Sequence, residues 1–109
     1  VGLVQASAGG TQIEQWIPKE ALKTADPGNI QFAVRDKARA QLAAEPKARA
    51  SGIQSGASSM YDGTIHPMRF AKWTGVVWYQ GEANSRVKTY YRMLLKTLVQ
   101  SWRQLFGQP

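Results

Sequence analysis

The pattern of apolar positions divides the chain into two short apolar runs and one long helical stripe. Residues 1–6 (VGLVQA) and 75–80 (GVVWYQ) are apolar almost throughout. Such continuous runs are typical of parallel strands that helices cover on both faces. Between Ser85 and Gly107 apolar residues instead recur at helical spacing, which predicts a long helix that Gly107 ends. Its expected buried stripe comprises Val87, Tyr90, Tyr91, Leu94, Leu95, Leu98, Trp102, Leu105 and Phe106.

Each apolar run is followed by a turn that carries polar groups. Gly9 and Gly10 follow the first run, and then come Thr11 and Glu14, which have the spacing of a capping box at a helix start. The second run is followed by Gln80, Gly81, Glu82 and Asn84. Ligands of α/β proteins bind at the carboxyl ends of strands, where the N–H groups of such turns are also free. The two turns therefore predict a functional site.

The length of the chain, 109 residues, allows one small domain. We expect residues 1–109 to form a single partial α/β domain, in which residues 27–59 are a variable, exposed insertion of helix and loop. The apolar spacing within that insertion is weak. Residues 60–68 (MYDGTIHPM) follow it as a compact segment, in which Asp62 and Gly63 predict a turn.

Composition excludes some classes of function. Fourteen Lys and Arg against seven Asp and Glu give a formal net charge of +7, which would suit a nucleic-acid partner. The charges are spread along the chain and no recognition motif is present, so we interpret them as a solvated basic face and expect no nucleic acid. The absence of cysteine excludes disulfides and thiolate metal sites. No run approaches the length of a membrane span and no signal-peptide pattern occurs, so we expect a soluble protein without a membrane partner, and its compartment is not predicted.

The two turns offer groups that stabilise a developing oxyanion, as acyl transfer requires. The first turn supplies the backbone N–H groups of Gly9, Gly10 and Thr11, and the second supplies the N–H of Gly81 and the side-chain amide of Asn84. Glu82 has two interpretations of equal weight. It either bonds neighbouring backbone N–H groups and braces the turn, or it orients the site.

Three further residues are candidates for the site. Gln80 and Trp78 are candidates for substrate binding, although an aromatic residue beside a strand is more often part of the core. His66 is the only histidine, and it is therefore the only possible neutral-pH general base of that type. Ser58 and Ser59 precede it as possible nucleophiles. Because triads are defined by geometry and this spacing sets none, we favour a His66 that packs in its own turn.

The segments VGLVQASAGGTQIEQW, MYDGTIHPM, GVVWYQGEAN and YYRMLLKTLVQSWRQLFG resemble, in this order, the sialate O-acetylesterases. These are carbohydrate esterases among the SGNH hydrolases, and the resemblance fades between about residues 25 and 56. It implies a flavodoxin-like three-layer α/β fold and hydrolysis of acetyl esters on sugars, with no metal or cofactor. By motif match, the oxyanion hole of the family falls at Gly10, or its neighbour Gly9, and at Asn84. The family's tryptophan before the glycine pair is replaced by Ala8.

Two motifs of the family are missing from these residues. The nucleophile of the family lies in a GQSN-type turn and its histidine in a DxxH-type motif, and neither occurs here. We therefore expect a partial fold that lacks the first and last strands. In flavodoxin-like order the first strand lies between the second and third, so the two strands of this chain either pair directly or recruit a strand from another chain.

Two functions follow from this interpretation. The first is a carbohydrate-esterase-like protein, with a serine-esterase mechanism, that acts on an acetylated carbohydrate or small ester and depends on a partner chain or on an improvised nucleophile. The alternative is a non-catalytic remnant of the esterase fold that binds a glycan or self-assembles. Because bare edges of apolar strands tend to associate, we expect a homo-oligomer or a complementing chain.

Overall fold

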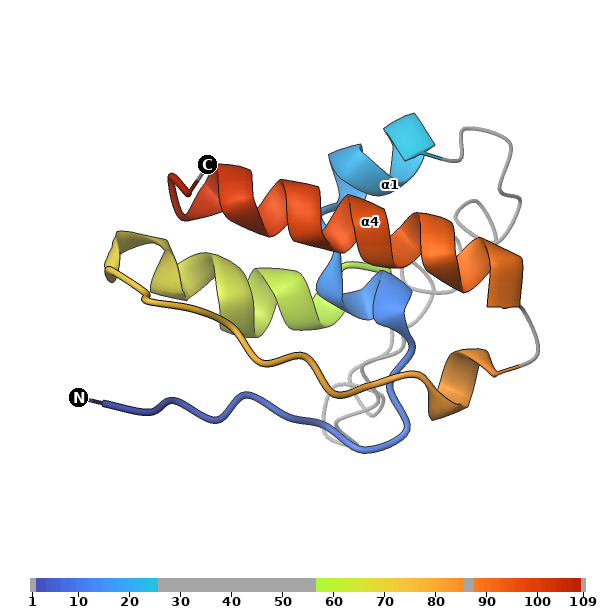
Figure 1. Ribbon diagram of the computed structural model, residues 1–109, viewed down its shortest axis with the longest axis horizontal. Helices are drawn as coiled ribbons and strands as arrows, with labels where there is room; N and C mark the ends of the chain where they lie inside the picture. Colours follow the sequence, from blue (N-terminus) through green and yellow to red (C-terminus); the bar gives the residue numbers. More distant parts are fainter. Residues whose placement is uncertain (1, 26–56, 86–87, 109) are drawn as a thin grey trace, which may run out of the picture.

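The computed structural model describes residues 2–25, 57–85 and 88–108, and the described part is built from short helical elements around one long helix (Figure 1). The helix α4 (Lys88–Leu105) packs on the short helix α1 (Lys19–Ala25) and on a 3-10 turn, η1. The remaining elements are η1 (Ile13–Trp16), a π-helical turn η2 (Tyr61–Ile65), and the 3-10 turns η3 (His66–Phe70) and η4 (Glu82–Asn84).

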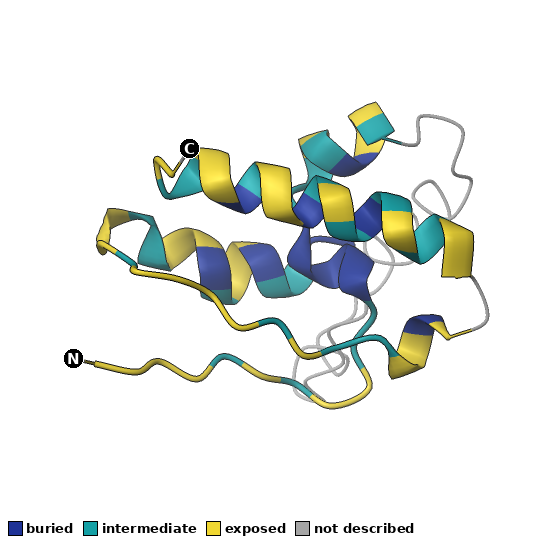
Figure 2. Ribbon diagram, viewed as in Figure 1, coloured by how far each residue is buried: buried dark blue, intermediate teal, exposed yellow. Residues whose placement is uncertain are grey.

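The long helix forms where the apolar periodicity predicts it. Leu94, Leu98 and Trp102 lie at i, i+4 and i+8 and are all buried, whereas the opposite face of α4 is exposed (Figure 2). The predicted end at Gly107 is confirmed. Gly107 has a φ of +65°, its N–H donates to the Gln104 carbonyl at 3.4 Å, and the next N–H donates to the Arg103 carbonyl at 2.8 Å. This pair of bonds is a Schellman motif, which satisfies the last carbonyls of the helix. The rest of the predicted stripe, Tyr90, Tyr91, Leu95, Leu105 and Phe106, is partly buried against the core, and Val87 lies outside the described residues.

The first turn of helix after the glycine pair begins later than the sequence predicts. Helical structure starts at Ile13, and the N–H of Gln12 donates to Oε1 of Gln15 at 2.9 Å. The predicted capping box of Thr11 and Glu14 is therefore wrong. The Thr11 hydroxyl donates to the carbonyl of Ala8 at 2.8 Å instead, and Glu14 turns towards a different partner in the interior.

A row of aromatic rings joins the core elements. Trp78 lies between Trp16 of η1 and Trp102 of α4, with ring centroids 5.7 and 5.6 Å away and nearly perpendicular planes. Phe106 extends the row from Trp102 to Trp73 at 6.5 and 6.3 Å. Edge-to-face geometry is the favourable arrangement for such pairs. The indole N–H of Trp102 donates to the Trp16 carbonyl at 2.9 Å, which fixes α4 against η1.

The two predicted strands are extended segments, residues 2–8 and 75–80, that form no ladder within the described residues. Figure 1 shows them running in the same direction along one face of the molecule. A strand exists only through backbone bonds to a neighbour, and within the described residues these two segments neither pair with each other nor with a third segment. The predicted α/β sheet, with or without its first and last strands, is thus not confirmed by the described residues, which are mostly helical. One of the two expected outcomes was direct pairing of the two segments, and this pairing does not occur within the described residues.

Most of the predicted insertion 27–59 lies outside the described residues. Its last part is described. Ala57 and Ser58 are buried there against the core, with 8% and 1% of their surface exposed.

Packing of α4 yields the first testable prediction. Leu94 is fully buried, so Leu94→Ala should lower the free energy of unfolding by about 2–5 kcal/mol, because the smaller side chain leaves a cavity. Val99 lies on the same helix but is 39% exposed, so Val99→Ala is a matched control with a loss below about 1 kcal/mol. Urea unfolding followed by circular dichroism measures both. Equal losses for the two variants would contradict this packing of α4.

Candidate functional site

The side chain of Asn84 joins the two predicted turns. Asn84 is buried, with 3% of its surface exposed, and its Oδ1 accepts a hydrogen bond from the Ile13 backbone N–H at 3.0 Å. The same oxygen accepts from Nε2 of Gln80 at 3.0 Å, while Nδ2 donates to Oε2 of Glu14 at 3.0 Å. Because a backbone N–H can only donate, the contact with Ile13 determines which end of the amide is oxygen. The amide group therefore has one defined orientation.

Gln80 extends this network to the first turn and to α4. Its Nε2 also donates to the backbone carbonyl of Thr11 at 2.8 Å. The backbone carbonyl of Gln80 accepts a hydrogen bond from the Tyr91 hydroxyl at 2.7 Å. The Tyr91 hydroxyl in turn accepts from the indole N–H of Trp78 at 3.3 Å. Oε1 of Gln80 is a buried acceptor with no partner among the described atoms. This oxygen can take up a further donor.

Glu14 places a carboxylate inside this network. It is 4% exposed, and no salt bridge to it is present within the part of the chain that the structure describes. A buried carboxylate is costly unless hydrogen bonds compensate the loss of water. The amide of Asn84 supplies such a bond, so the two side chains stabilise each other.

The glycines of both turns adopt backbone conformations that other residues rarely take. Gly10 has a φ of +74° and Gly81 a φ of +159°. A Cβ on Gly81 would lie 3.6 Å from the Tyr91 hydroxyl oxygen, whereas none of the described atoms lies within 4 Å of one on Gly10. Gly10 is exposed, and the Gly81 carbonyl accepts from the Asn84 N–H at 3.0 Å. The backbone conformation of each turn thus requires a glycine. The backbone of Gly10 is also exposed to solvent.

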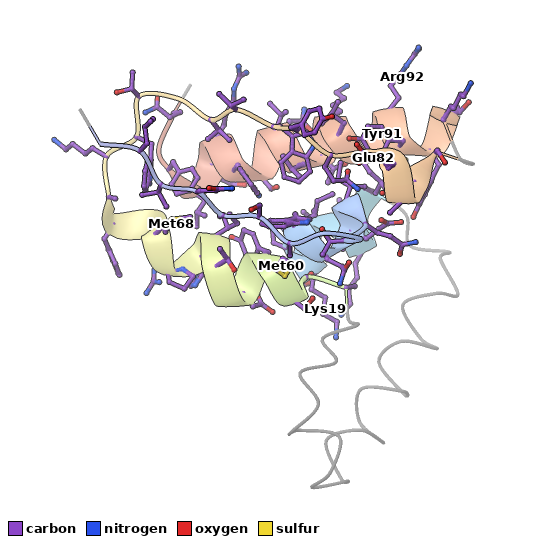
Figure 3. All side chains as sticks on the ribbon, turned by 90° about the horizontal axis from the view of Figure 1, so that it is seen from below. Lys19, Met60, Met68, Glu82, Tyr91 and Arg92 are labelled. Atoms are coloured by element: carbon purple, nitrogen blue, oxygen red, sulfur yellow. The ribbon has the colours of Figure 1, made fainter. Side chains whose placement is uncertain are left out.

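The other predicted residues of the second turn have different surroundings. Glu82 is exposed at the start of η4, at the end of the molecule where Tyr91 also lies (Figure 3). Trp78 is half-buried, with its ring in the aromatic row and its N–H on Tyr91. The structure therefore brings Asn84, Gln80 and the first turn together, with Glu82 at the edge of the group.

The contacts of His66 within the described residues include no member of this network. It is exposed, and Nη1 of Arg69 lies 3.4 Å from its Nδ1 and donates to its carbonyl at 3.0 Å. Its ring also lies 5.9 Å from that of Tyr61. Burial raises the pKa of the Tyr61 hydroxyl above its ordinary value, the negative charge of Asp62 adds to the rise, and Arg69 opposes it. This phenol stays protonated at neutral pH.

The serines before His66 have other partners. Ser58 is 1% exposed and its hydroxyl donates to the carbonyl of Ile17 at 2.6 Å, while Oγ of Ser59 accepts from Gln15 Nε2 at 3.4 Å. No hydrogen bond joins either serine to His66 among the described residues. The structure thus shows no improvised pair of nucleophile and base at this place.

Two residues of the network were missed by sequence reasoning. Glu14 was assigned to a capping box, and Tyr91 was counted only as part of an apolar stripe. Their polar atoms are what contribute here, because the Glu14 carboxylate accepts from Asn84 of the second turn and the Tyr91 hydroxyl of α4 donates to the Gln80 carbonyl. An acidic residue just after a glycine pair, and a tyrosine within an apolar stripe, were the only signs of them.

Two kinds of feature were sought in residues 2–25, 57–85 and 88–108. These residues contain no group of three His, Cys, Asp or Glu side chains arranged to hold a metal ion. None of the described helices is long and apolar enough to cross a membrane.

Comparisons with known proteins give one consistent result. Residues 1–109 match the protein family described as carbohydrate esterase, sialic acid-specific acetylesterase. The chain is 32% identical to a sialate O-acetylesterase of Rattus norvegicus over 127 residues, which cover 97% of this chain and 22% of the rat protein. It is likewise 32% identical to a sialate O-acetylesterase of Homo sapiens over 110 residues, or 97% of this chain and 18% of the human protein. The chain thus spans about a fifth of the length of these relatives. No solved structure matches it.

The contact of Asn84 with Glu14 can be tested by an exchange of groups. Asn84→Asp removes the donor and sets a second carboxylate against Glu14, so we expect a loss of at least about 2 kcal/mol in unfolding free energy at pH 7. Mutual repulsion raises the pKa of one carboxyl in the folded state, so this loss should shrink as the pH falls towards about 4. Chemical unfolding across this pH range measures it.

The double variant Asn84→Asp with Glu14→Gln is the matched control, because it restores a donor and an acceptor with the positions exchanged. It should recover most of the lost stability at pH 7. A double variant that is no more stable than Asn84→Asp alone would show that the two side chains do not interact.

The hydroxyl of Tyr91 is tested by Tyr91→Phe. The change removes the acceptor of the Trp78 N–H and the donor to the Gln80 carbonyl, so the free energy of unfolding should fall by about 1 kcal/mol. Tyr79→Phe is the control, because Tyr79 is 92% exposed and should tolerate the change. Thermal unfolding of both variants distinguishes them, and similar melting temperatures would contradict a role for the Tyr91 hydroxyl.

Proposed function

This chain belongs to the carbohydrate esterase, sialic acid-specific acetylesterase family, and from that premise we propose that it supplies the oxyanion-stabilising side of a site that hydrolyses O-acetyl esters on sugars. The observation that carries the proposal is the bonding of Asn84, which ties the turn at Gly10 to the turn at Gly81 through Ile13, Glu14 and Gln80. A rigid pair of turns is what oxyanion stabilisation requires, because the donors must be in place before charge develops.

The chemistry assigned to this side is stabilisation of a tetrahedral intermediate. When a serine hydroxyl attacks the acetyl carbonyl, the carbonyl oxygen becomes an oxyanion and the proton of the hydroxyl passes to a histidine. The backbone N–H groups of Gly10 and Gly81 are the proposed donors to that oxyanion. Asn84 has a second hydrogen on Nδ2, because Glu14 takes only one, and this hydrogen completes the set. The sugar alkoxide then leaves with the proton from the histidine, and water hydrolyses the acetyl-enzyme.

The attacking serine and its histidine are assigned to a complementing polypeptide. No GQSN or DxxH motif occurs in the 109 residues. The buried hydroxyl of Ser58 is already bonded to the Ile17 carbonyl. The matched relatives are far longer than this chain, which covers 18% of the human protein. These observations support an enzyme that acts only together with further chain.

Substrate contact is assigned to Gln80, Trp78 and Glu82. Oε1 of Gln80 is a buried acceptor that has no partner among the described atoms, and a hydroxyl group is a suitable donor to it. Trp78 is half-buried two positions before Gln80, and Glu82 lies exposed at the edge of the group.

One observation favours the alternative, a non-catalytic form of this fold that self-assembles or binds a glycan. The extended segments expose large apolar side chains, with Leu3 and Val77 each 97% exposed and Tyr79 92% exposed. Apolar surface of this kind marks an association site.

The proposal is tested by complementation. The chain is coexpressed with a sialate O-acetylesterase polypeptide from which the matching segment has been deleted, and hydrolysis of p-nitrophenyl acetate is measured. We expect activity only when both polypeptides are present. Asn84→Ala should lower kcat by about 10²–10³-fold, the typical effect of losing one oxyanion donor, at temperatures where the variant is folded.

Two variants serve as controls in this assay. Lys96→Ala on the exposed face of α4 should leave kcat unchanged. His66→Ala should also leave it unchanged, whereas a loss of activity would identify His66 as the base. A complemented complex without activity, or one in which Asn84→Ala has no effect on kcat, would contradict the proposed function and favour the non-catalytic alternative.

A further inference from the structure

The turn that carries Gly10 is held by the side chain of Thr11. Gly9 and Gly10 are the central residues of this turn, between Ala8 and Thr11. The hydroxyl of Thr11 donates to the backbone carbonyl of Ala8 at 2.8 Å. This hydrogen bond links the two ends of the turn.

The indole of Trp16 fixes the direction of that hydrogen bond. Its N–H donates to Oγ1 of Thr11 at 3.0 Å. Because an indole N–H can only donate and a carbonyl can only accept, the single hydrogen of the hydroxyl must point to Ala8. Trp16 is 4% exposed, and its own carbonyl accepts from the indole of Trp102 at 2.9 Å. The bond across the turn is thus anchored to the aromatic row of the core.

The backbone carbonyl of Thr11 connects the same turn to the second one. It accepts from Nε2 of Gln80 at 2.8 Å, and this nitrogen also donates to Oδ1 of Asn84 at 3.0 Å. Thr11 therefore holds the first turn with its side chain and joins it to the hydrogen bonds of Asn84 with its backbone.

The direction of the Gly10 N–H depends on the conformation of this turn. The φ of Gly10, +74°, is close to the value of about +80° at the third position of a type II turn, whereas a type I turn has about −90° there. A change from one type to the other turns over the peptide group that carries the Gly10 N–H. Among the described residues this N–H has no hydrogen-bond partner, and Gly10 is exposed, so the N–H can serve a ligand.

We propose that Thr11 is a positioning residue for the oxyanion donor at Gly10, an inference that rests on the proposed function. Its hydroxyl holds the turn in the conformation that directs the Gly10 N–H to the developing charge. Oxyanion donors act only when they are in place before that charge develops, so a loosened turn lowers kcat. Because the interaction is made in the transition state and not in the bound ester, KM stays the same.

Thr11→Val tests the hydroxyl, because valine has nearly the shape of threonine but can form neither of its side-chain hydrogen bonds. The assay is hydrolysis of p-nitrophenyl acetate by the complemented complex. We expect kcat to fall at least about tenfold with KM unchanged, since small displacements of catalytic groups are costly. Thr11→Ala, which also lacks the hydroxyl and is smaller, should show the same loss. Thr11→Ser keeps the hydroxyl and should retain most of kcat.

Thr97→Val is the matched control. The Thr97 hydroxyl is half-buried like that of Thr11 and also donates to a backbone carbonyl, that of Met93 at 3.0 Å, but it lies within α4. Its loss should leave kcat unchanged. Circular dichroism identifies the temperatures at which every variant is folded, and kcat is compared there.

A second measurement follows the turn in the chain alone. In NMR spectra of the backbone and indole N–H groups, Thr11→Val should shift the Gly10 amide resonance. It should also speed the hydrogen exchange of the Trp16 indole N–H, which loses its acceptor. Thr11→Ser should leave both signals close to their wild-type values. Unchanged signals in Thr11→Val overturn the inference whatever the activity.

The kinetic outcomes separate this inference from the proposed function. If Asn84→Ala lowers kcat and Thr11→Val does not, the inference is overturned and the proposed function stands. A rise in KM alone, or an equal loss of kcat in Thr11→Ser, also overturns it, because neither follows from loss of the hydroxyl that holds an oxyanion donor. A wild-type complex without activity contradicts the proposed function, and the inference is overturned with it.

Discussion

The hydrogen bonds of one buried amide hold the candidate site together. Oδ1 of Asn84 accepts from Ile13, which lies 71 positions earlier in the chain, and Nδ2 donates to Glu14, which lies 70 positions earlier. Closing so long a loop costs conformational entropy. Hydrogen bonds in the protein interior are electrostatically stronger than in water and help to offset that cost. Gln80 binds both the amide and the Thr11 carbonyl, so the two turns have one relative position. Every role assigned to the glycines of these turns depends on that position.

The network lies against the aromatic part of the core. Trp78 belongs to the second extended segment, yet its ring lies between Trp16 and Trp102, and its N–H reaches Tyr91 of α4. The same segment thus carries a packing residue and, two positions later, a bonding residue, Gln80. Large rigid aromatic groups lose little rotamer freedom when buried, so they position the polar groups beside them at small entropic cost. The candidate site and the aromatic core are therefore built on the same segment of chain.

On their other face, residues 2–8 and 75–80 expose apolar side chains to solvent. Leu3 and Val77 are almost fully exposed, and no backbone–backbone hydrogen bond involves residues 2–8 or 75–80 in the described part of the chain. This lack of pairing explains how a chain that matches an esterase family over its whole length shows helices and no ladder in its described part. A helix satisfies its own backbone, whereas a strand needs a neighbour.

Local patterns in the sequence were enough to determine the long helix, its end and the family. The apolar period of 3.6 residues was enough to predict α4 and its buried face, since a helix pairs residues only three or four positions apart. The end at Gly107 followed from the freedom of glycine to adopt positive φ. The order of the motifs GGT, IHP and WYQGEAN was enough to identify the family.

The tertiary structure decided what depends on distant partners. The sequence marks residues 1–6 and 75–80 as apolar and extended, but only the absence of a neighbour in the described residues keeps them from forming strands. Spacing placed Glu14 in a capping box with Thr11, whereas folding brought it to Asn84. Likewise Tyr91 looked like core until its hydroxyl met the Gln80 carbonyl. Such contacts join residues far apart in the chain, and no local pattern specifies which polar atom will meet which.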